Sequence, residues 1–262
     1  MIRGLYSAAS GMLVAQSLVD TTANNLANVD TNGFKRAVLQ VESAPTLELY
    51  RFQTNPGQTA ARATPGVPTQ TSIGTLGLGA QVYDTPTSFQ QGSLQQTDDP
   101  LDLALVGPGF FSVQTPAGVR YTRDGSFVRS AQGELVTQSG QPVLSTTGTP
   151  ITLAQGPFTV DTDGTVRQQG APVAQLAVVR FANLRNLRPE GNDLFLNEGA
   201  GPTQDNTTTS VQQGYLEKST VNVVHSMVDL ISAERFFDAN SKAVQIENTA
   251  LGLAVQTVGA NH

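Results

Sequence analysis

Apolar residues recur every seven positions at both ends of the chain. Intervals of three and four residues alternate from Ile2 to Leu26, and the same period runs from Val223 to Val258 near the C-terminus. The bulky column of the first segment consists of Leu5, Met12, Val19 and Leu26, and that of the second of Val223, Leu230, Phe237, Val244, Leu251 and Val258. A seven-residue apolar period is typical of helices that pack along a seam. It predicts two terminal helices.

Between these segments the pattern changes to short apolar stretches separated by turn residues such as TPAG, TDG and QGAP. Turns about 8–12 residues apart are typical of antiparallel β domains. We predict strands at residues 80–85, 101–105, 109–114, 119–122, 126–129, 134–137, 158–161, 165–168 and 174–182. The expected fold class is α+β. Its N- and C-terminal helices pair as a coiled coil, and an antiparallel β-rich domain is inserted between them.

These changes of pattern divide the chain into five segments. Residues 1–30 form the N-terminal helix, and residues 31–74 form an extended connector rich in Pro, Thr and Gln. Residues 75–200 form the β-rich domain, and residues 201–217 form a connector that leads back to the helices. Residues 218–262 form the C-terminal helix.

Composition excludes several classes of protein. The 262 residues include no cysteine, so there is no disulfide and no cysteine-based metal site. Only 14% of residues are charged and the net charge is −6, which argues against nucleic-acid binding. No apolar stretch approaches the ~20 residues of a membrane span. Serines and Gln16 interrupt the apolar residues at the start of the chain, so we expect no cleavable signal peptide.

The terminal segments are almost free of charge. Residues 1–29 contain only Arg3 and Asp20 as charged residues, and residues 248–262 contain no Asp, Glu, Lys or Arg. The outer faces of the helices are therefore built from Ser, Thr, Ala, Asn and Gln, which can contact protein or water. The pattern alone fits an intramolecular coiled coil, a stable dimer or a polymer of many copies.

Candidate catalytic and metal-binding residues do not form a coherent site. His225 falls on a predicted helix and His262 at the terminus, where a surface position is the better interpretation. The DTDGTV stretch (161–166) predicts a hairpin turn rather than a calcium loop. The GTLGLG stretch (74–79) lacks dinucleotide-binding spacing, and TDDPLD (97–102) predicts an exposed loop. We expect no enzyme, no catalytic residue, no metal and no cofactor.

The stretch ANNLANVDTNGFKR (23–36) ends the first helix. Asn24 and Asn28 are four residues apart and suit polar pairing with neighbouring subunits. Gly33 predicts a helix stop with a positive φ, and Phe34 is expected to pack back on the helix. The cations Lys35 and Arg36 would lie favourably beyond the helix C-terminus.

This stretch resembles the signature of the bacterial flagellar axial proteins of rod and hook, near Ala-Asn-Asn-Leu-Ala-Asn-x-x-Thr-x-Gly-Phe-Lys-Arg. Residues 110–144 are similar to the central block of that family, with Tyr121-Thr122-Arg123 in place. Residues 214–245 resemble its C-terminal signature, especially that of the distal-rod members. The opening MIRGLYSAASGM looks as much like the proximal-rod members.

The resemblance implies a structural subunit of the flagellar basal-body rod, of distal-rod type. Such subunits polymerise helically into a hollow drive shaft that crosses the periplasm and transmits torque from motor to hook. Implied partners are further copies, neighbouring rod and hook proteins, surrounding ring proteins and the flagellar export apparatus. Residues 54–74 fall where distal-rod relatives carry a segment that stiffens contacts between subunits. The expected assembly interface comprises Leu5, Met12, Val19, Asn24, Asn25, Leu26, Asn28, Gly33, Phe34, Val223, Leu230, Phe237, Val244, Leu251 and Val258.

Three alternatives remain at this point. The first is a proximal-rod or hook-type member of the same family. The second is a secreted β-rich binding module that its helices dimerise. The third is a hydrolase whose site lies in the β domain, at Asp98, Asp99 and Asp102.

Overall fold

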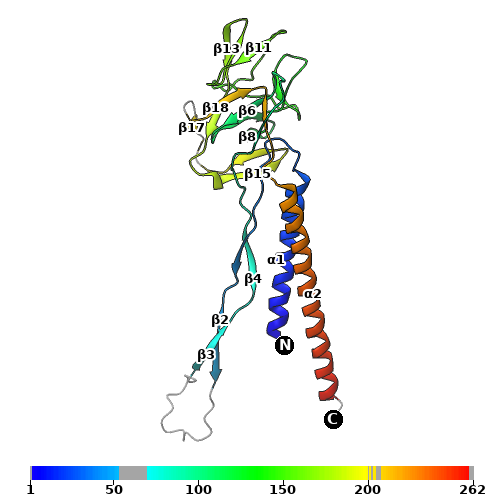
Figure 1. The fold of residues 1–262 in the computed structure, drawn as a ribbon. Helices are drawn as coiled ribbons and strands as arrows, with labels where there is room; N and C mark the ends of the chain where they lie inside the picture. The colour runs from blue at the N-terminus through cyan, green and yellow to red at the C-terminus, as the bar shows by residue number, and fades with distance from the viewer. Residues whose placement is uncertain (1, 53–69, 200, 202, 205–207, 260–262) are drawn as a thin grey trace, which may run out of the picture. The chain divides into compact units, whose positions relative to one another are not determined.

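The computed structural model describes residues 2–52, 70–199, 201, 203–204 and 208–259 (Figure 1). The chain divides into two compact units, which are considered separately. The first unit combines the residues up to Asp20, residues 39–85 and the residues from Asp229 onward. The second unit combines residues 21–38 and 86–228.

Two long helices occupy the ends of the chain. Helix α1 spans Ile2–Ala27 and helix α2 spans Val223–Gly259. The start of α2 is capped by Asn222, whose side-chain oxygen accepts from the backbone N–H of His225 (3.1 Å). The same residue's carbonyl accepts from the N–H of Ser226 (2.9 Å). His225 is exposed, as the sequence predicts, and His262 lies outside the described residues.

In the first unit the helices run antiparallel (Figure 1) and contact each other through small residues of α1. Gly4 lies opposite Glu247, and Gly11 lies opposite Asn240. A Cβ atom would come within 2.4 Å of Glu247 Oε1 at Gly4, and within 2.8 Å of Asn240 Oδ1 at Gly11. These two glycines are seven residues apart, as are their partners. The seven-residue period therefore marks a helix contact, and Gly4 and Gly11, which lie outside the predicted columns, take part in it.

Two antiparallel strand pairs complete the first unit. Strand β1 (Gln40–Ser43) pairs with β4 (Ala80–Asp84), and β2 (Leu47–Phe52) pairs with β3 (Gln70–Leu76). The backbone N–H of Ala80 donates to Ser10 Oγ on α1 (3.2 Å), next to the positive-φ Gly79. The described part of residues 31–74 thus contains paired strands, while residues 53–69 lie outside the described part.

The second unit is built from antiparallel strands. Its largest sheet has six strands in the order β15-β16-β8-β7-β14-β17. Their bounds are β15 Leu187–Gly191, β16 Leu194–Asn197, β8 Gly118–Thr122, β7 Phe110–Thr115, β14 Val178–Arg180 and β17 Thr203–Gln204. Smaller sheets pair β9 (Phe127–Arg129) with β10 (Leu135–Thr137), β18 (Ser210–Gln213) with β6 (Leu103–Val106), and β19 (Tyr215–Glu217) with β5 (Leu94–Gln96). Strands β11 (Phe158–Val160), β12 (Thr165–Gln168) and β13 (Ala171–Gln175) form a three-stranded sheet, and a 3-10 turn spans Leu184–Asn186.

Alternation along β7 places its side chains in two apolar clusters. Phe111 and Val113 belong to the larger cluster, together with residues such as Leu103 and Leu105. Phe110 points the other way into a smaller aromatic cluster with Phe181 and others. Successive side chains of a strand point to opposite faces, so one strand serves both clusters.

The α+β class, the two terminal helices and the antiparallel β-rich centre are confirmed. Strand β12 coincides with the predicted 165–168, and the DTDG turn joins β11 to β12 as a hairpin. The long strand predicted at 174–182 is wrong, because β13 ends at Gln175 and β14 begins at Val178. Between them Leu176 donates its N–H to Gly164, so the chain changes partners there.

Candidate functional site

The segment that follows α1 lies wholly in the second unit. The helix ends at Ala27, after which the N–H groups of Asn28 and Val29 bond to carbonyls three residues back. The Asn28 side-chain amide donates to the carbonyl of Asn24 (2.9 Å), and Thr31 Oγ1 donates to Asn28 Oδ1 (3.3 Å). Asn28 therefore satisfies one of the carbonyls that a helix end leaves unpaired.

Asn25 closes the segment into a loop. Its side-chain nitrogen donates to the carbonyl of Ala37 (2.8 Å), and its side-chain oxygen accepts from the N–H of Ala37 (2.9 Å). The Asn25 side chain is buried. A buried side-chain amide that is bonded at both ends fixes the residues between positions 25 and 37.

Gly33 allows this loop to contact the β domain closely. Its φ is +72°, and its N–H donates to the carbonyl of Glu217 (2.7 Å). A Cβ atom here would meet the backbone of Arg123 and Asp124 at 2.5–2.7 Å. The positive φ is confirmed, but the predicted helix stop is wrong because α1 ends six residues earlier. The glycine is required by the close approach of two backbones.

Lys35 lies beyond the end of α1, as predicted, and it is buried. Its ammonium donates to Glu217 Oε1 (2.6 Å) and to the carbonyl of Gln90 (2.7 Å). The exposed fractions of the two side chains are 0% for Lys35 and 1% for Glu217. Burial lowers the pKa of Lys35, and the neighbouring Glu217 carboxylate opposes that shift. Arg36, in contrast, is exposed.

A second cation reaches the same carboxylate. Arg123 Nη1 lies 3.3 Å from Glu217 Oε2, and its Nη2 donates to the carbonyl of Gly107 (2.7 Å). Its guanidinium also covers the ring of Phe110, 4.9 Å from the centroid. Burial lowers the pKa of Arg123, again opposed by Glu217. Lys35, Arg123 and Glu217 form a buried group, here called the charge cluster.

The charge cluster lies where the chain enters and leaves the β domain. Residues 33–36 and 217–220 run side by side in the same direction. Thr220 donates its N–H to the carbonyl of Phe34 (3.1 Å), and Thr220 Oγ1 accepts from the N–H of Arg36 (3.0 Å). The Gly92 N–H also donates to Glu217 Oε1 (2.6 Å). The signature residues thus join three parts of the second unit that are distant in sequence.

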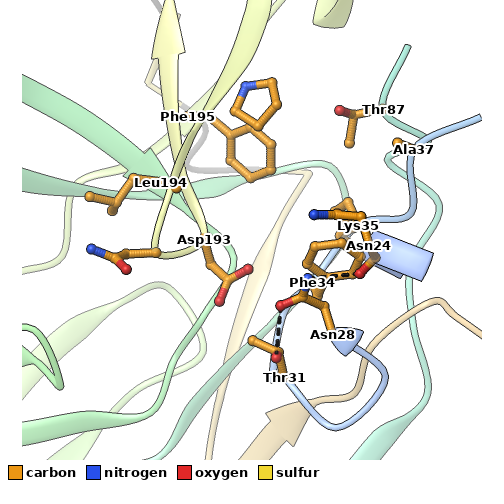
Figure 2. A pocket seen from close by; sticks show the side chains of 13 residues that line it. Asn24, Asn28, Thr31, Phe34, Lys35, Ala37, Thr87, Asp193, Leu194 and Phe195 are labelled. Carbon is orange, nitrogen blue, oxygen red and sulfur yellow. Dashed lines mark hydrogen bonds between the residues drawn. The ribbon is translucent and has the colours of Figure 1, made fainter. Parts of the chain in front are cut away.

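A groove of about 520 Å³ opens between this loop and the β15–β16 hairpin (Figure 2). We call it the motif groove. It is lined by Asn24, Asn28, Thr31, Phe34, Lys35, Ala37, Thr87, Pro189, Gly191, Asn192, Asp193, Leu194 and Phe195. Figure 2 shows the Asp193 carboxylate pointing from the hairpin toward Phe34, Asn28 and Thr31. Signature residues and hairpin residues therefore face each other across one hollow.

Asp193 has an unusual electrostatic environment. Desolvation raises its pKa to about 6, with a further contribution from the negative charge of Asp124. The pKa of Asp124 is itself raised by burial. Asp193 is half-buried, and its carboxylate has no hydrogen-bond or ion-pair partner among the residues that the structure describes.

The expected interface residues fall into three groups. The helix residues of the bulky columns are half-buried, apart from Val223, which is exposed, and Val258, whose side chain lies outside the described part. Asn24 is exposed, while Asn28 and Phe34 are half-buried and line the motif groove. Asn25 and Gly33 are buried within the subunit.

Lys35, Arg123, Glu217 and Asp193 are the site residues that sequence reasoning missed. The sequence places Lys35 beyond a helix end and Arg123 within a family signature, and neither position indicates burial. One signal was present for Glu217, which ends a short apolar stretch in the C-terminal signature. Among the described residues, no group of His, Cys, Asp and Glu could hold a metal ion, and no helix is long and apolar enough to cross a membrane.

Comparison with known proteins gives matches along most of the chain. The family model "Flagella basal body rod protein" matches residues 5–35, and "Flagellar hook protein FlgE/F/G D1 domain" matches residues 104–168. "Flagellar basal body rod FlgEFG protein C-terminal" matches residues 212–257.

Full-length relatives agree with these matches. The flagellar basal-body rod protein FlgG of Borreliella burgdorferi is 35% identical, over 97% of this chain and 98% of the relative. The flagellar hook-basal body complex protein FlhO of Bacillus subtilis is 32% identical over 99% of both chains. The flagellar basal-body rod protein FlgF of Caulobacter vibrioides is 34% identical over 95% of this chain and 94% of the relative.

Proposed function

The chain belongs to the family of flagellar basal-body rod proteins, and on this premise we propose that it is a distal-rod subunit that polymerises helically into a hollow drive shaft. The shaft transmits torque from motor to hook, and its core is formed by the terminal helices packed as coiled coils. That the chain is a structural subunit of the flagellar rod follows from its family.

The observation that carries polymerisation is the apolar surface of the helices in the first unit. Leu13 on α1 is 72% exposed, and Ile246 and Val255 on α2 are 70% and 71% exposed. Further exposed apolar residues on these helix segments are Tyr6, Ile231, Phe236 and Leu253. Covering an exposed large apolar side chain is worth about 1.5–3 kcal/mol. Exposed apolar patches on a subunit mark surfaces that bind protein.

Other copies of the chain are the partners that best fit this surface. The end of α2 beyond Glu247, which carries Leu253 and Val255, has no charged residue. Neutral polar and apolar side chains can pack against the same kind of surface on a second copy. A helical array of identical contacts covers both helices of every subunit except at the ends of the polymer.

The distal position is supported by the sequence. Residues 214–245 resemble the C-terminal signature of distal-rod members, and residues 54–74 fall where those members carry a stiffening segment. Neighbouring rod and hook proteins, ring proteins and the flagellar export apparatus are the partners that this position implies. The corresponding location is the part of the rod that crosses the periplasm.

Assembly can be tested with a single exposed residue. Ile246→Lys should prevent polymerisation of the purified protein and abolish motility, because it places a charge in the proposed helix contact. The matched control is Val173→Lys, an exposed apolar residue on β13 that is 48% accessible. The control should still polymerise. Electron microscopy and sedimentation measure the outcome, and equal behaviour of the two variants would contradict the proposed contact.

The position in the rod needs a cellular test. Basal bodies isolated from cells that lack this protein should retain a shortened rod and carry no hook. Rods that end at the motor, without a visible stub, would indicate a proximal subunit instead.

A further inference from the structure

We propose that the motif groove receives a basic side chain, Arg235 or Lys242, from α2 of a neighbouring copy, which pairs with Asp193. This inference rests on the proposed function, because it assigns one polar contact within the polymer. It adds a specific acceptor in the β domain to the apolar helix contacts described above.

The groove offers a single, half-buried anion, Asp193, and neither of the two nearby cations is available for it. Lys35 lines the groove, but its ammonium already contacts Glu217 and the carbonyl of Gln90. Arg123 is likewise bound to Glu217 and Gly107. Asp193 therefore lies half-buried without a counter-ion from the described residues, which costs free energy in an isolated subunit.

The shape and chemistry of the groove suit a long basic side chain. Phe34, Pro189 and Phe195 provide an apolar lining for an aliphatic stem. Asn28 and Asn192 also line the groove, and their side-chain amides offer oxygen acceptors for a guanidinium or ammonium group. A neutral or acidic side chain would leave Asp193 unpaired.

Helix α2 exposes two cations that match this acceptor. Arg235 and Lys242 are both exposed, and neither forms an ion pair with any residue that the structure describes. They are seven residues apart, which places them on the same helix face. Lys242 also lines a shallow apolar hollow with Ile246 and Leu253. The unpaired cations thus belong to the face that we propose is covered by other copies.

The hairpin fixes the backbone that carries Asp193. Asn192 and Asp193 have φ values of +50° and +55°, which non-glycine residues rarely adopt. Leu194 and Phe195, which follow directly, are buried. The backbone beneath the carboxylate is therefore already ordered, so docking a cation requires ordering of the Asp193 side chain only.

The first test is loss of charge. Asp193→Asn should raise the critical concentration for polymerisation on the order of 10-fold, because the incoming cation loses its partner. The matched control is Asp30→Asn, which removes one exposed carboxylate from the same loop and should change the critical concentration less than about 2-fold. Asp193→Asn keeps the folded subunit intact, since it removes a desolvated charge. An unchanged critical concentration would overturn the inference.

The second test is exchange of charge. Asp193→Arg should weaken polymerisation further. Combining Asp193→Arg with Arg235→Asp or with Lys242→Asp should restore polymerisation, but only for the cation that makes the contact. Restoration by neither combination overturns the inference. If the wild-type protein does not polymerise, the proposed function itself is wrong. If the wild type polymerises but Asp193 has no effect, only the proposed contact is wrong.

Cross-linking distinguishes a contact between two copies from a contact within one chain. The natural sequence has no cysteine, so Asp193→Cys combined with Arg235→Cys or Lys242→Cys introduces a single pair. Under oxidation the polymer should give a ladder of linked subunits, and dilute monomer should not. A linked monomer without a ladder would place the contact within one chain and overturn the inference.

The strength of the contact should also depend on pH. The groups around Asp193 are Asp124 from the turn after β8, Lys35 from the loop, and Asp30 in the adjoining hollow. Since the pKa of Asp193 is about 6 in the free subunit, docking must displace a proton below that pH. The difference in critical concentration between wild type and Asp193→Asn should shrink as the pH falls from 8 to 5. A constant difference would contradict the role of this carboxylate.

Discussion

Replacement of Glu217 tests whether the charge cluster stabilises the base of the β domain. In Glu217→Gln the amide oxygen can still accept from the Gly92 N–H, but Lys35 and Arg123 lose their shared negative charge. The Lys35 and Glu217 side chains are at most 1% exposed, so water cannot compensate. Removing one partner of such a buried ion pair costs about 3–5 kcal/mol. The variant should therefore melt roughly 10 °C lower than the wild type.

Two further variants separate charge from packing. Lys35→Met leaves Arg123 and Glu217 as a neutral pair and loses the bonds to Glu217 and Gln90, so it should cost only about 1–2 kcal/mol. Arg188→Gln breaks the exposed pair with Glu198 and should change stability by less than about 1 kcal/mol.

The stability lost in Glu217→Gln should depend on pH. In Glu217→Gln the pKa of Lys35 falls further, because Glu217 is the group that opposes the lowering caused by burial. A base with a lowered pKa in the folded state costs stability while it is charged, and the cost disappears as pH rises toward 10.5. The deficit of Glu217→Gln should therefore shrink between pH 7 and 10. Thermal unfolding of dilute protein by circular dichroism measures this, and a larger loss in Lys35→Met than in Glu217→Gln would refute the reasoning.

Three other predictions concern the same loop and groove. Gly33→Ala should lower the free energy of unfolding by about 1–3 kcal/mol more than Gly140→Ala does. Both glycines have a positive φ, but only Gly33 lies against the backbone of another segment. Urea unfolding measures the two free energies. Asn25→Ala should cost about 1–3 kcal/mol of stability, because it leaves the N–H and carbonyl of Ala37 without their partner. Asn24→Ala, at an exposed position, should cost less. Equal losses in calorimetry would show that the loop closure is unimportant. Asp193→Asn should stabilise the dilute subunit by up to about 3 kcal/mol at pH 8, and this gain should vanish below pH 4, since a raised carboxyl pKa costs stability only where the group must ionise. A gain that did not depend on pH would exclude that explanation.

Local patterns were sufficient for the helices and for the run of strands from β6 to β12 in the β domain. The TVRQ strand at 165–168 has both alternation and flanking turn residues, so its period is visible in the sequence. The strands at Leu187–Gly191 and Leu47–Phe52 were missed for a physical reason. The first contains Arg, Pro and Glu, and the second belongs to a two-stranded pair with largely exposed side chains. Neither has a buried face that would impose alternation.

The candidate site depended on contacts that local patterns do not contain. Lys35 and Glu217 are 182 residues apart, and charged residues are rarely buried unless they are paired. The sequence of Lys35-Arg36 therefore gives no sign that Lys35 is buried while Arg36 is exposed. The pattern also did not single out the glycines of the helix contact. Bulky residues define the period, but Gly4 and Gly11 provide the space that Glu247 and Asn240 occupy.

The parallel course of residues 33–36 and 217–220 has a mechanical consequence. One of these segments follows α1 and the other precedes α2, so a force that pulls the two helices apart acts in opposite directions along the pair. The bonds from Gly33 to Glu217, from Thr220 to Phe34 and from Arg36 to Thr220 must then be sheared together rather than opened one after another. This arrangement lets the base of the β domain resist tension, which would suit the proposed drive shaft.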